Sequence, residues 1–170
     1  MRQARTDALT GLAHHGAFHD CLADEMARAE RYGHVLSVAV LDLDHFKSVN
    51  DRQGRAAGDR ALREVARRMV GPARGIDITG RLGGEEFGWL MPQTGIDGAR
   101  AAAERLRVSM ARDPVGDVGR LTASIGIAER APGEDGASLM PRADRALYRA
   151  KGEGRDRSVV APPPGQRGVA

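Results

Sequence analysis

The 170-residue sequence contains very few cysteine and aromatic residues, and each shortage excludes a class of structure. Its single cysteine, Cys21, cannot form an internal disulfide or a cysteine-rich zinc site, which is typical of proteins in a reducing compartment. Aromatic residues make up 4% of the chain, too few for the stacking surfaces that bind single-stranded nucleic acid. The sequence therefore predicts a cytoplasmic location and no nucleic-acid partner.

Long hydrophobic runs and a secretion signal are also lacking. No apolar stretch approaches the roughly 18 residues of a membrane-spanning helix, so we expect no membrane contact by this segment. The net charge of +3 is compatible with phosphate-bearing partners but identifies none. The length suits one domain, which we place at residues 1–158. A short terminal strand and a disordered tail rich in proline and glycine are expected over 159–170.

Lysine is nearly absent from a chain that is rich in basic residues. Of the 26 basic side chains, only Lys47 and Lys151 are lysines. Arginine binds planar anions through a fork of donors, whereas lysine supplies a compact and mobile point charge. Chance alone can explain this bias, but it draws attention to both lysines.

Hydrophobic periodicity predicts alternating helices and strands along the chain. The predicted helices cover 16–33, 58–71, 94–113 and 137–152, and the predicted strands cover 34–44, 78–82, 87–91, 120–129 and 157–160. The polar segment 45–54 is predicted to be a turn. Because strands and helices interleave, the sequence favours an α/β or α+β layered fold.

Two acidic clusters occur at the ends of predicted strands. Asp42 and Asp44 end the valine-rich strand, and Glu85 and Glu86 follow a Gly-Gly turn. Functional groups in such sheets gather at strand ends, and oxygen ligands without nearby histidine or cysteine suit Mg²⁺ rather than zinc. Since Mg²⁺ usually binds one or two carboxylates together with substrate phosphates, the pattern predicts a phosphate-bearing substrate. Solvated acidic turns are the alternative for both clusters.

With these acidic clusters and the motifs given below, the chain resembles the GGDEF domain, the catalytic module of diguanylate cyclases. The signature is present as GGEEF at Gly83–Phe87, within RLGGEEF. Other motifs follow the family's order: DALTGL from Asp7, DLDHFKSVND from Asp42, GD at Gly58, AERLR from Ala103, TASIGIA from Thr122 and ADRALYRAKGEGR from Ala143. The resemblance covers roughly residues 7–157. It implies a central mixed, mostly antiparallel sheet flanked by helices, like that of nucleotidyl cyclases and polymerase palms.

The resemblance implies a nucleotidyltransferase that condenses two GTP molecules into cyclic di-GMP and pyrophosphate. The 3′-hydroxyl of each GTP attacks the α-phosphorus of the other, assisted by Mg²⁺ or Mn²⁺. By resemblance, Asp42, Glu85 and the Leu43 carbonyl are metal ligands, and Glu86 lies near the attacking hydroxyl or a second metal. Because one domain holds one GTP, the implied catalyst is a homodimer.

The other substrate contacts also come from the resemblance. Asn50 and Asp59 match the residues that bind guanine, since an amide and a carboxylate can pair with the edge of the purine. Gly83 and Gly84 would let the backbone approach the triphosphate, and we expect them to adopt positive φ. The positions that match phosphate contacts are Lys47, Lys151 and Arg155. Ordinary turn chemistry, helix capping and cations at a helix C-terminus are the alternative explanations of these residues.

A second nucleotide site is implied before the signature. Arg74 and Asp77 occur at the spacing of the family's inhibitory RxxD motif, and Arg105 matches an assisting residue on the next helix. The resemblance implies that cyclic di-GMP binds there and inhibits its own synthesis. In an arginine-rich chain, however, RxxD also arises by chance.

Two segments depart from the family's pattern. His14-His15 replaces Asn-Arg in the entry segment, and Gln53–Arg55 replaces Tyr-Gly-His close to the nucleotide. Two alternatives to the cyclase stay open: a catalytically silent receptor that binds cyclic di-GMP at Arg74 and Asp77, and a cyclase that uses ATP in one position. Asp59 argues against the second alternative. Since domains of this family usually follow a sensor or regulatory domain, we expect one in the full-length protein.

Overall fold

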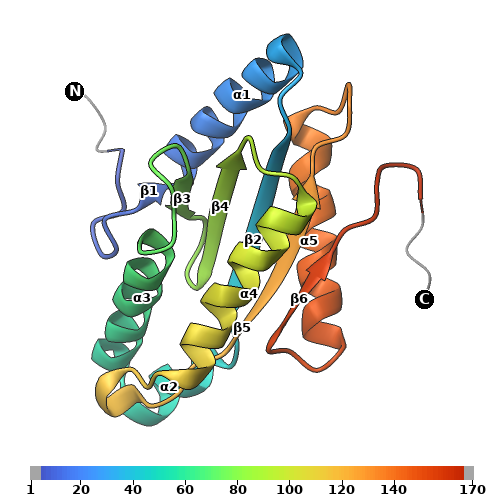
Figure 1. Ribbon diagram of the computed structural model, residues 1–170. Helices are drawn as coiled ribbons and strands as arrows, with labels where there is room; N and C mark the ends of the chain where they lie inside the picture. Colours follow the sequence, from blue (N-terminus) through green and yellow to red (C-terminus); the bar gives the residue numbers. More distant parts are fainter. Residues whose placement is uncertain (1–4, 167–170) are drawn as a thin grey trace.

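The valine-rich run forms β2, the third strand from one edge of a six-stranded sheet in the computed structural model, which describes residues 5–166 (Figure 1). The strands are β1 (Ala13–His14), β2 (Leu36–Leu43), β3 (Ile78–Arg81), β4 (Glu86–Pro92), β5 (Ala123–Glu129) and β6 (Arg157–Val160). The helices are α1 (His15–Tyr32), α2 (Phe46–Gln53), α3 (Arg55–Val70), α4 (Ile96–Arg112), α5 (Gly136–Gly152) and a short 3₁₀ helix, η1 (Gly116–Val118).

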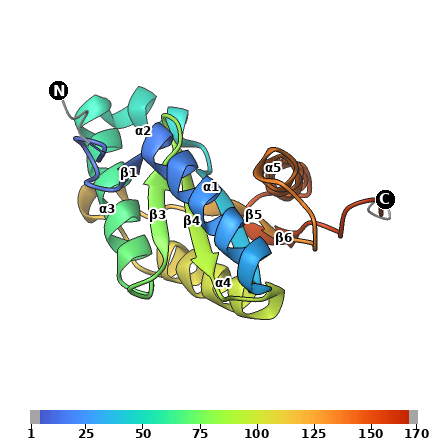
Figure 2. The ribbon, with the colours of Figure 1, turned by 90° about the horizontal axis from the view of Figure 1, so that it is seen from above.

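The sheet has the strand order β1-β3-β4-β2-β5-β6. The two outer pairs, β1 with β3 and β5 with β6, are parallel, whereas the three inner pairs are antiparallel. Helices cover both faces, with α4 on one side and α1 and α5 on the other (Figure 2). The predicted mixed, mostly antiparallel sheet flanked by helices is confirmed.

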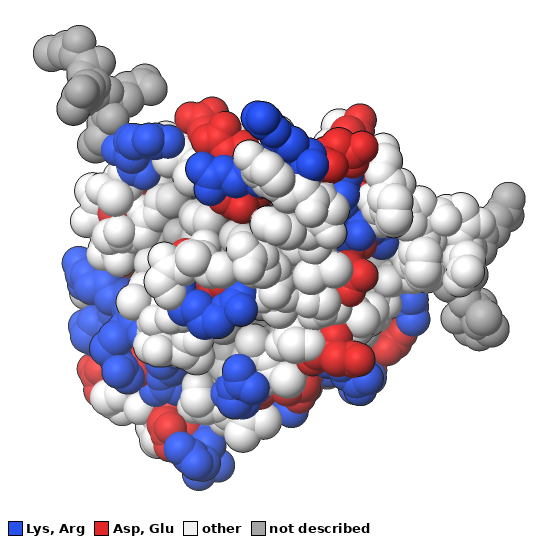
Figure 3. Space-filling view, turned by 45° about the horizontal axis from the view of Figure 1, so that its top comes forward, with Lys and Arg blue, Asp and Glu red and all other residues white. Residues whose placement is uncertain are grey.

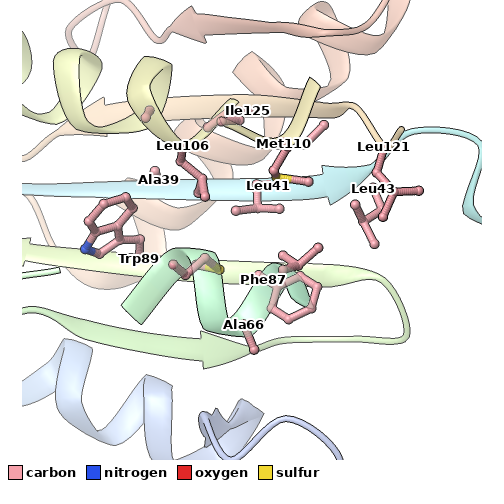
Figure 4. Close-up of a cluster of buried hydrophobic side chains, with 14 of the residues drawn as sticks. Ala39, Leu41, Leu43, Ala66, Phe87, Trp89, Leu106, Met110, Leu121 and Ile125 are labelled. Atoms are coloured by element: carbon pink, nitrogen blue, oxygen red, sulfur yellow. The ribbon is translucent and has the colours of Figure 1, made fainter. Parts of the chain in front are cut away.

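Alternation along β2 assigns its side chains to two separate cores. Leu41 and Leu43 pack on the side of α3 and α4, in the cluster drawn in Figure 4. Val38 and Val40 pack on the opposite side, against α1 and α5. Both faces are therefore covered, and all eight residues of the strand are buried, as expected for a nearly continuous apolar run. By the same alternation, Asp42 follows Val40 on the α1–α5 face.

A glycine in β5 lets α5 lie unusually close to the sheet. A Cβ atom at Gly126 would be only 2.1 Å from the Ala143 carbonyl oxygen and 2.3 Å from the Leu147 amide nitrogen. Both of those atoms are backbone, so no side-chain rotation relieves the contact. The position of α5, and of Lys151 near its C-terminal end, therefore depends on the absence of a side chain at Gly126.

Within the segment 45–54, Phe46–Gln53 form the helix α2, so the prediction of a turn there was wrong. This helix has eight residues, only Phe46 is buried, and isolated helices of that length are marginal in water. Its stability comes from packing against α3, where a Cβ atom at Gly58 would lie 3.1 Å from the Phe46 ring and 2.0 Å from the Asn50 amide oxygen. The start of α3 was also predicted too late: the helix begins at Arg55, not at Gly58. Gly54, with φ 84°, separates α2 from α3.

The C-terminal strand β6 pairs with β5 and adds the last strand to the sheet. The chain then continues along α5, where the Arg142 guanidinium donates to the Pro162 carbonyl over 2.8 Å. The first four residues of the predicted domain and the last four of the predicted tail lie outside the described residues. Within residues 5–166, none of the helices has the length and apolar character needed to cross a bilayer.

Charged side chains of both signs are interspersed over the face in Figure 3. Basic side chains gather along its left edge, on the side where Figure 1 places α3. That helix carries five arginines among sixteen residues. The charge on this face is therefore mixed, with one arginine-rich edge.

Candidate active site

Strand pairing brings the two acidic clusters together at one end of the sheet. Asp42, the penultimate residue of β2, lies opposite Glu86, the first residue of β4. The next residue, Leu43, donates its backbone N–H to the Glu85 carbonyl over 3.2 Å. Segments more than 40 residues apart in sequence thus bring the carboxylates of Asp42, Glu85 and Glu86 close to one another.

The cluster carries an excess of negative charge. Burial raises the pKa of Glu85, and the charges of Asp42 and Glu86 raise it further, while Lys151 opposes the change. Burial also raises the pKa of Glu86, together with the charges of Asp42 and Asp144. The Lys151 ammonium lies 2.9 Å from the Asp42 carboxylate. One lysine thus partly neutralises a group of carboxylates, and such a group favours a further cation.

The oxygen donors at this end of the sheet have the chemistry that hard divalent cations prefer. Asp42 and Glu85 supply carboxylates, and the Leu43 backbone, which follows Asp42, is hydrogen-bonded to the backbone of Glu85. Within residues 5–166, no three side chains of histidine, cysteine, aspartate or glutamate are arranged to hold a metal by themselves. Mg²⁺ usually takes only one or two protein carboxylates and completes its shell with water and substrate phosphates, so this donor set fits it.

The Gly-Gly turn is held by an arginine that the sequence analysis did not select. Arg81 donates to the Gly83 carbonyl over 3.1 Å and to the Gly84 carbonyl over 2.8 Å, and it also lies 3.3 Å from the Asp7 carboxylate. Arg81 and Asp7 belong to the motifs RLGGEEF and DALTGL, so their place in these motifs could have identified them from the sequence. The expected positive φ at Gly83 and Gly84 is wrong: neither occurs in the left-handed region. The chain reverses here in a wider loop between β3 and β4.

The predicted guanine contacts lie on two helices that pack against each other. Asn50 is on α2 and Asp59 is on α3, one residue after Gly58. The Asn50 side chain occupies the space that a Cβ atom at Gly58 would need, 2.0 Å from its amide oxygen. Lys47 lies one turn before Asn50 and is exposed. The glycine of the GD motif, Gly58, is therefore explained by packing, because a side chain there would overlap Asn50.

Lys151 and Arg155 lie at the end of α5 and in the turn that follows. Arg155 is exposed and has φ 64°, in the left-handed region that residues with side chains rarely adopt. The next residue, Asp156, has φ 45° and donates its backbone N–H to Asp44 over 3.0 Å. Asp44 was grouped with Asp42 in the sequence, but its carboxylate is turned to hydroxyl and amide donors of the protein.

The arginine and the aspartate of the RxxD motif form an ion pair with each other. Arg74 lies 3.0 Å from the Asp77 carboxylate and also donates to the Pro92 carbonyl over 2.7 Å. Asp77 in turn accepts from the indole of Trp89 over 3.2 Å. Arg105 is exposed on α4, and among the described residues no hydrogen bond joins it to Arg74 or Asp77. The first two predicted residues are thus brought together, and no recorded hydrogen bond joins the third to them.

The His14-His15 departure retains a capping function. His14 is the N-cap of α1, and its ring nitrogen Nδ1 accepts from the Ala17 amide over 3.1 Å. The rings of His15 and His19 lie 4.4 Å apart on the first turns of the same helix. In the other departure, Gln53 donates to the Val118 carbonyl over 3.2 Å. Both altered segments therefore make ordered contacts.

Comparison with known proteins gives a consistent result. Residues 4–157 match the family model described as diguanylate cyclase, GGDEF domain. Diguanylate cyclase DgcP of Pseudomonas aeruginosa is 44% identical over 163 residues, which cover 94% of this chain and 24% of that protein. Diguanylate cyclase DgcM of Escherichia coli K12 is 38% identical over 158 residues, covering 93% of this chain and 38% of that protein.

A solved structure extends the similarity to the fold. The GGDEF domain of DgcB from Caulobacter crescentus in complex with c-di-GMP superposes with a TM-score of 0.88 at 41% identity, over 94% of this chain and 97% of that one. The chain spans only 24% and 38% of the two curated relatives, which are longer proteins. Because the family model covers nearly the whole sequence, the chain belongs to the family of diguanylate cyclase GGDEF domains.

Proposed function

We propose that this domain is a diguanylate cyclase that condenses two GTP molecules into cyclic di-GMP. Each 3′-oxygen forms a bond to the α-phosphorus of the other GTP, each α–β phosphoanhydride bond breaks, and two pyrophosphates and two protons leave. The observation that carries the proposal is the meeting of Asp42, Glu85 and Glu86 at one end of the sheet, beside Lys151. The DgcP and DgcM relatives are named diguanylate cyclases, which supports the same reaction.

Asp42, Glu85 and the Leu43 carbonyl would hold Mg²⁺ or Mn²⁺. When bound, the metal neutralises the leaving pyrophosphate and makes the 3′-hydroxyl more acidic. Glu86 lies across from Asp42 and would either accept a hydrogen bond from the attacking hydroxyl or contact a second metal.

Cationic side chains hold the triphosphate in this proposal. Lys151 now pairs with Asp42 and would contact a phosphate oxygen in the nucleotide complex. Lys47 and Arg155, both exposed, contact the phosphates from α2 and from the turn after α5. Gly83 and Gly84 are exposed, so the backbone of their turn is accessible to the nucleotide. The two lysines of the chain thus serve the same substrate.

Asn50 and Asp59 select guanine. Their amide and carboxylate match the donors and acceptors on the purine edge, and adenine would leave these groups unpaired. This requirement disfavours ATP as a substrate. Product cyclic di-GMP would bind at Arg74 and Asp77, with Arg105 assisting, and inhibit the enzyme.

Catalysis requires two copies of the domain. One chain has one carboxylate cluster and holds one GTP, so two domains must face each other to join two nucleotides. A regulatory domain in the full-length cytoplasmic protein would control this pairing. The rate per domain is therefore expected to rise with protein concentration.

Incubation with Mg²⁺ and GTP, followed by mass identification of the products, tests this function. Wild type should release cyclic di-GMP and two pyrophosphates per product. Glu85→Gln should lose turnover and remain folded, whereas the exposed control Asp24→Asn should keep it. Formation of a mixed product with ATP would support the ATP alternative. Binding of cyclic di-GMP with no turnover at any protein concentration would instead support the silent receptor.

A further inference from the structure

Asp44 is a buried carboxylate that lies two residues from Asp42 but has different partners. Only 5% of the residue is exposed. Its Oδ1 accepts from the Ser124 hydroxyl over 2.7 Å, and its Oδ2 accepts from the Thr122 hydroxyl over 2.7 Å. The backbone N–H of Asp156 also donates to Oδ2, over 3.0 Å. Both carboxylate oxygens are thus occupied by donors of the protein.

The donor of the third bond belongs to a strained turn. Arg155 and Asp156 have φ of 64° and 45°, and consecutive left-handed residues with side chains persist only when surrounding contacts hold them. Two contacts besides Asp44 do so. The Arg155 amide donates to the Ala150 carbonyl over 3.0 Å, and Arg107 of α4 pairs with the Asp156 carboxylate over 2.7 Å.

These contacts connect the turn to the end of β2 that carries the acidic cluster. Asp44 approaches Asp156 from β2, while Arg107 approaches it from α4. Asp156 is therefore the anchor of the turn. Arg155 is one residue before this anchor, and Lys151 is within the last turn of α5. Movement of the anchor would therefore change where both cations lie relative to Asp42.

We propose that Asp44 is a positioning residue that holds the turn after α5, so that Lys151 and Arg155 face the nucleotide. It is not a metal ligand. The phosphate part of this proposal rests on the proposed cyclase function, whereas the structural part does not. A carboxylate suits this position because it can accept from two hydroxyls and one amide at once.

Hydrogen exchange of the Asp156 amide tests the structural part without any catalysis. In wild type this amide should be protected, although the residue lies in an exposed turn. Asp44→Ala should increase its exchange rate by about tenfold or more. Ser124→Ala is the matched control, because it removes the bond to Oδ1 and leaves the bond from Asp156. An unprotected Asp156 amide in wild type, or equal protection in wild type and Asp44→Ala, would overturn the proposal.

Steady-state kinetics test the positioning of the cations. Asp44→Ala should raise the KM for GTP about tenfold and change kcat by less than about threefold, since it loosens groups that bind substrate. Asp44→Asn should restore KM to within about threefold of wild type, because its carbonyl oxygen can accept from Asp156 and Thr122 while its NH₂ donates to Ser124.

A metal-ligand role gives a different pattern. Asp44→Asn would then lose activity as completely as Asp42→Asn, and that outcome would overturn the proposal. An unchanged KM in Asp44→Ala would also contradict it. If no variant and no wild-type protein makes cyclic di-GMP, the cyclase function fails, but the exchange measurement still decides whether Asp44 holds the turn.

Discussion

Substitution of Gly126 by alanine should damage both the stability and the catalysis of this domain. Gly126 lies in β5 beneath α5, and the added Cβ atom would meet the Ala143 carbonyl oxygen at 2.1 Å and the Leu147 amide nitrogen at 2.3 Å. Ordinary van der Waals contacts of Cβ atoms begin near 3.4 Å. The helix must therefore retreat from the sheet by about 1 Å, because its backbone cannot rotate away.

The magnitude follows from this displacement. Overpacking of a core typically lowers the free energy of unfolding by about 1–3 kcal/mol. For a domain of this size, each kcal/mol lowers Tm by about 2–4 °C, so a decrease of roughly 2–12 °C is expected. The same displacement moves Lys151 away from the Asp42 carboxylate, which it now contacts at 2.9 Å. Misplacement by 1 Å can cost up to about 100-fold, and we expect kcat/KM to fall about 10–100-fold.

Thermal unfolding and GTP turnover of Gly126→Ala measure the two effects. Gly71→Ala is the control, since a Cβ atom at Gly71 would meet only ordinary contacts at 3.8 and 4.0 Å, and its φ of −54° suits alanine. Gly71→Ala should leave activity unchanged and Tm within about 2 °C of wild type. If Gly126→Ala matches this control in both measurements, α5 is not held against the sheet as described.

Three further results are expected. Burial raises the pKa of Glu85, so the protonated form stabilises the folded state at low pH and this contribution is lost as pH rises through the raised pKa. Glu85→Gln should therefore raise Tm at pH 7 in metal-free buffer by about 1–3 °C, and the gain should vanish toward pH 4; a gain that persists at pH 4 would refute this cause. Gly58→Ala should displace the Asn50 amide, loosen the packing of α2 against α3 and raise the KM for GTP about tenfold, and an unchanged KM would argue against Asn50 as a base contact. Arg74→Ala should abolish inhibition by cyclic di-GMP and the accompanying change in fluorescence of Trp89, the single tryptophan; inhibition that persists would place the inhibitory site elsewhere.

Much of the fold could be predicted from the sequence because local patterns and long-range pairing agree. The valine-rich run is buried on both faces, so its identity as an inner strand follows from composition alone. Helix α2 was missed because its stability comes from contact with α3 and from Gly58, a residue outside the helix. Contacts between separate segments leave no pattern in the local sequence from which the helix could be predicted.

In the candidate site, too, some features follow from the local sequence and others depend on contacts between distant residues. The sequence placed Asp42 and Glu85 at strand ends, and strand pairing brings them together. It also grouped Asp44 with Asp42 as neighbouring carboxylates at the end of one strand, since residues two apart in a strand share a face. Their difference depends on Thr122 and on Asp156, more than 70 residues away, which no spacing rule supplies. The positive φ expected at the Gly-Gly pair failed because the loop there is wider than a two-residue hairpin.

A crystal structure of the domain with Mn²⁺ and a non-reactive GTP analogue tests most directly whether Asp42 and Glu85 share a metal ion. Anomalous scattering should place Mn²⁺ between these two carboxylates and the triphosphate, at ligand distances of about 2.0–2.2 Å. In the same structure Lys151 should contact a phosphate oxygen instead of Asp42. A metal bound to the triphosphate alone, with Asp42 still paired to Lys151, would contradict the proposed site.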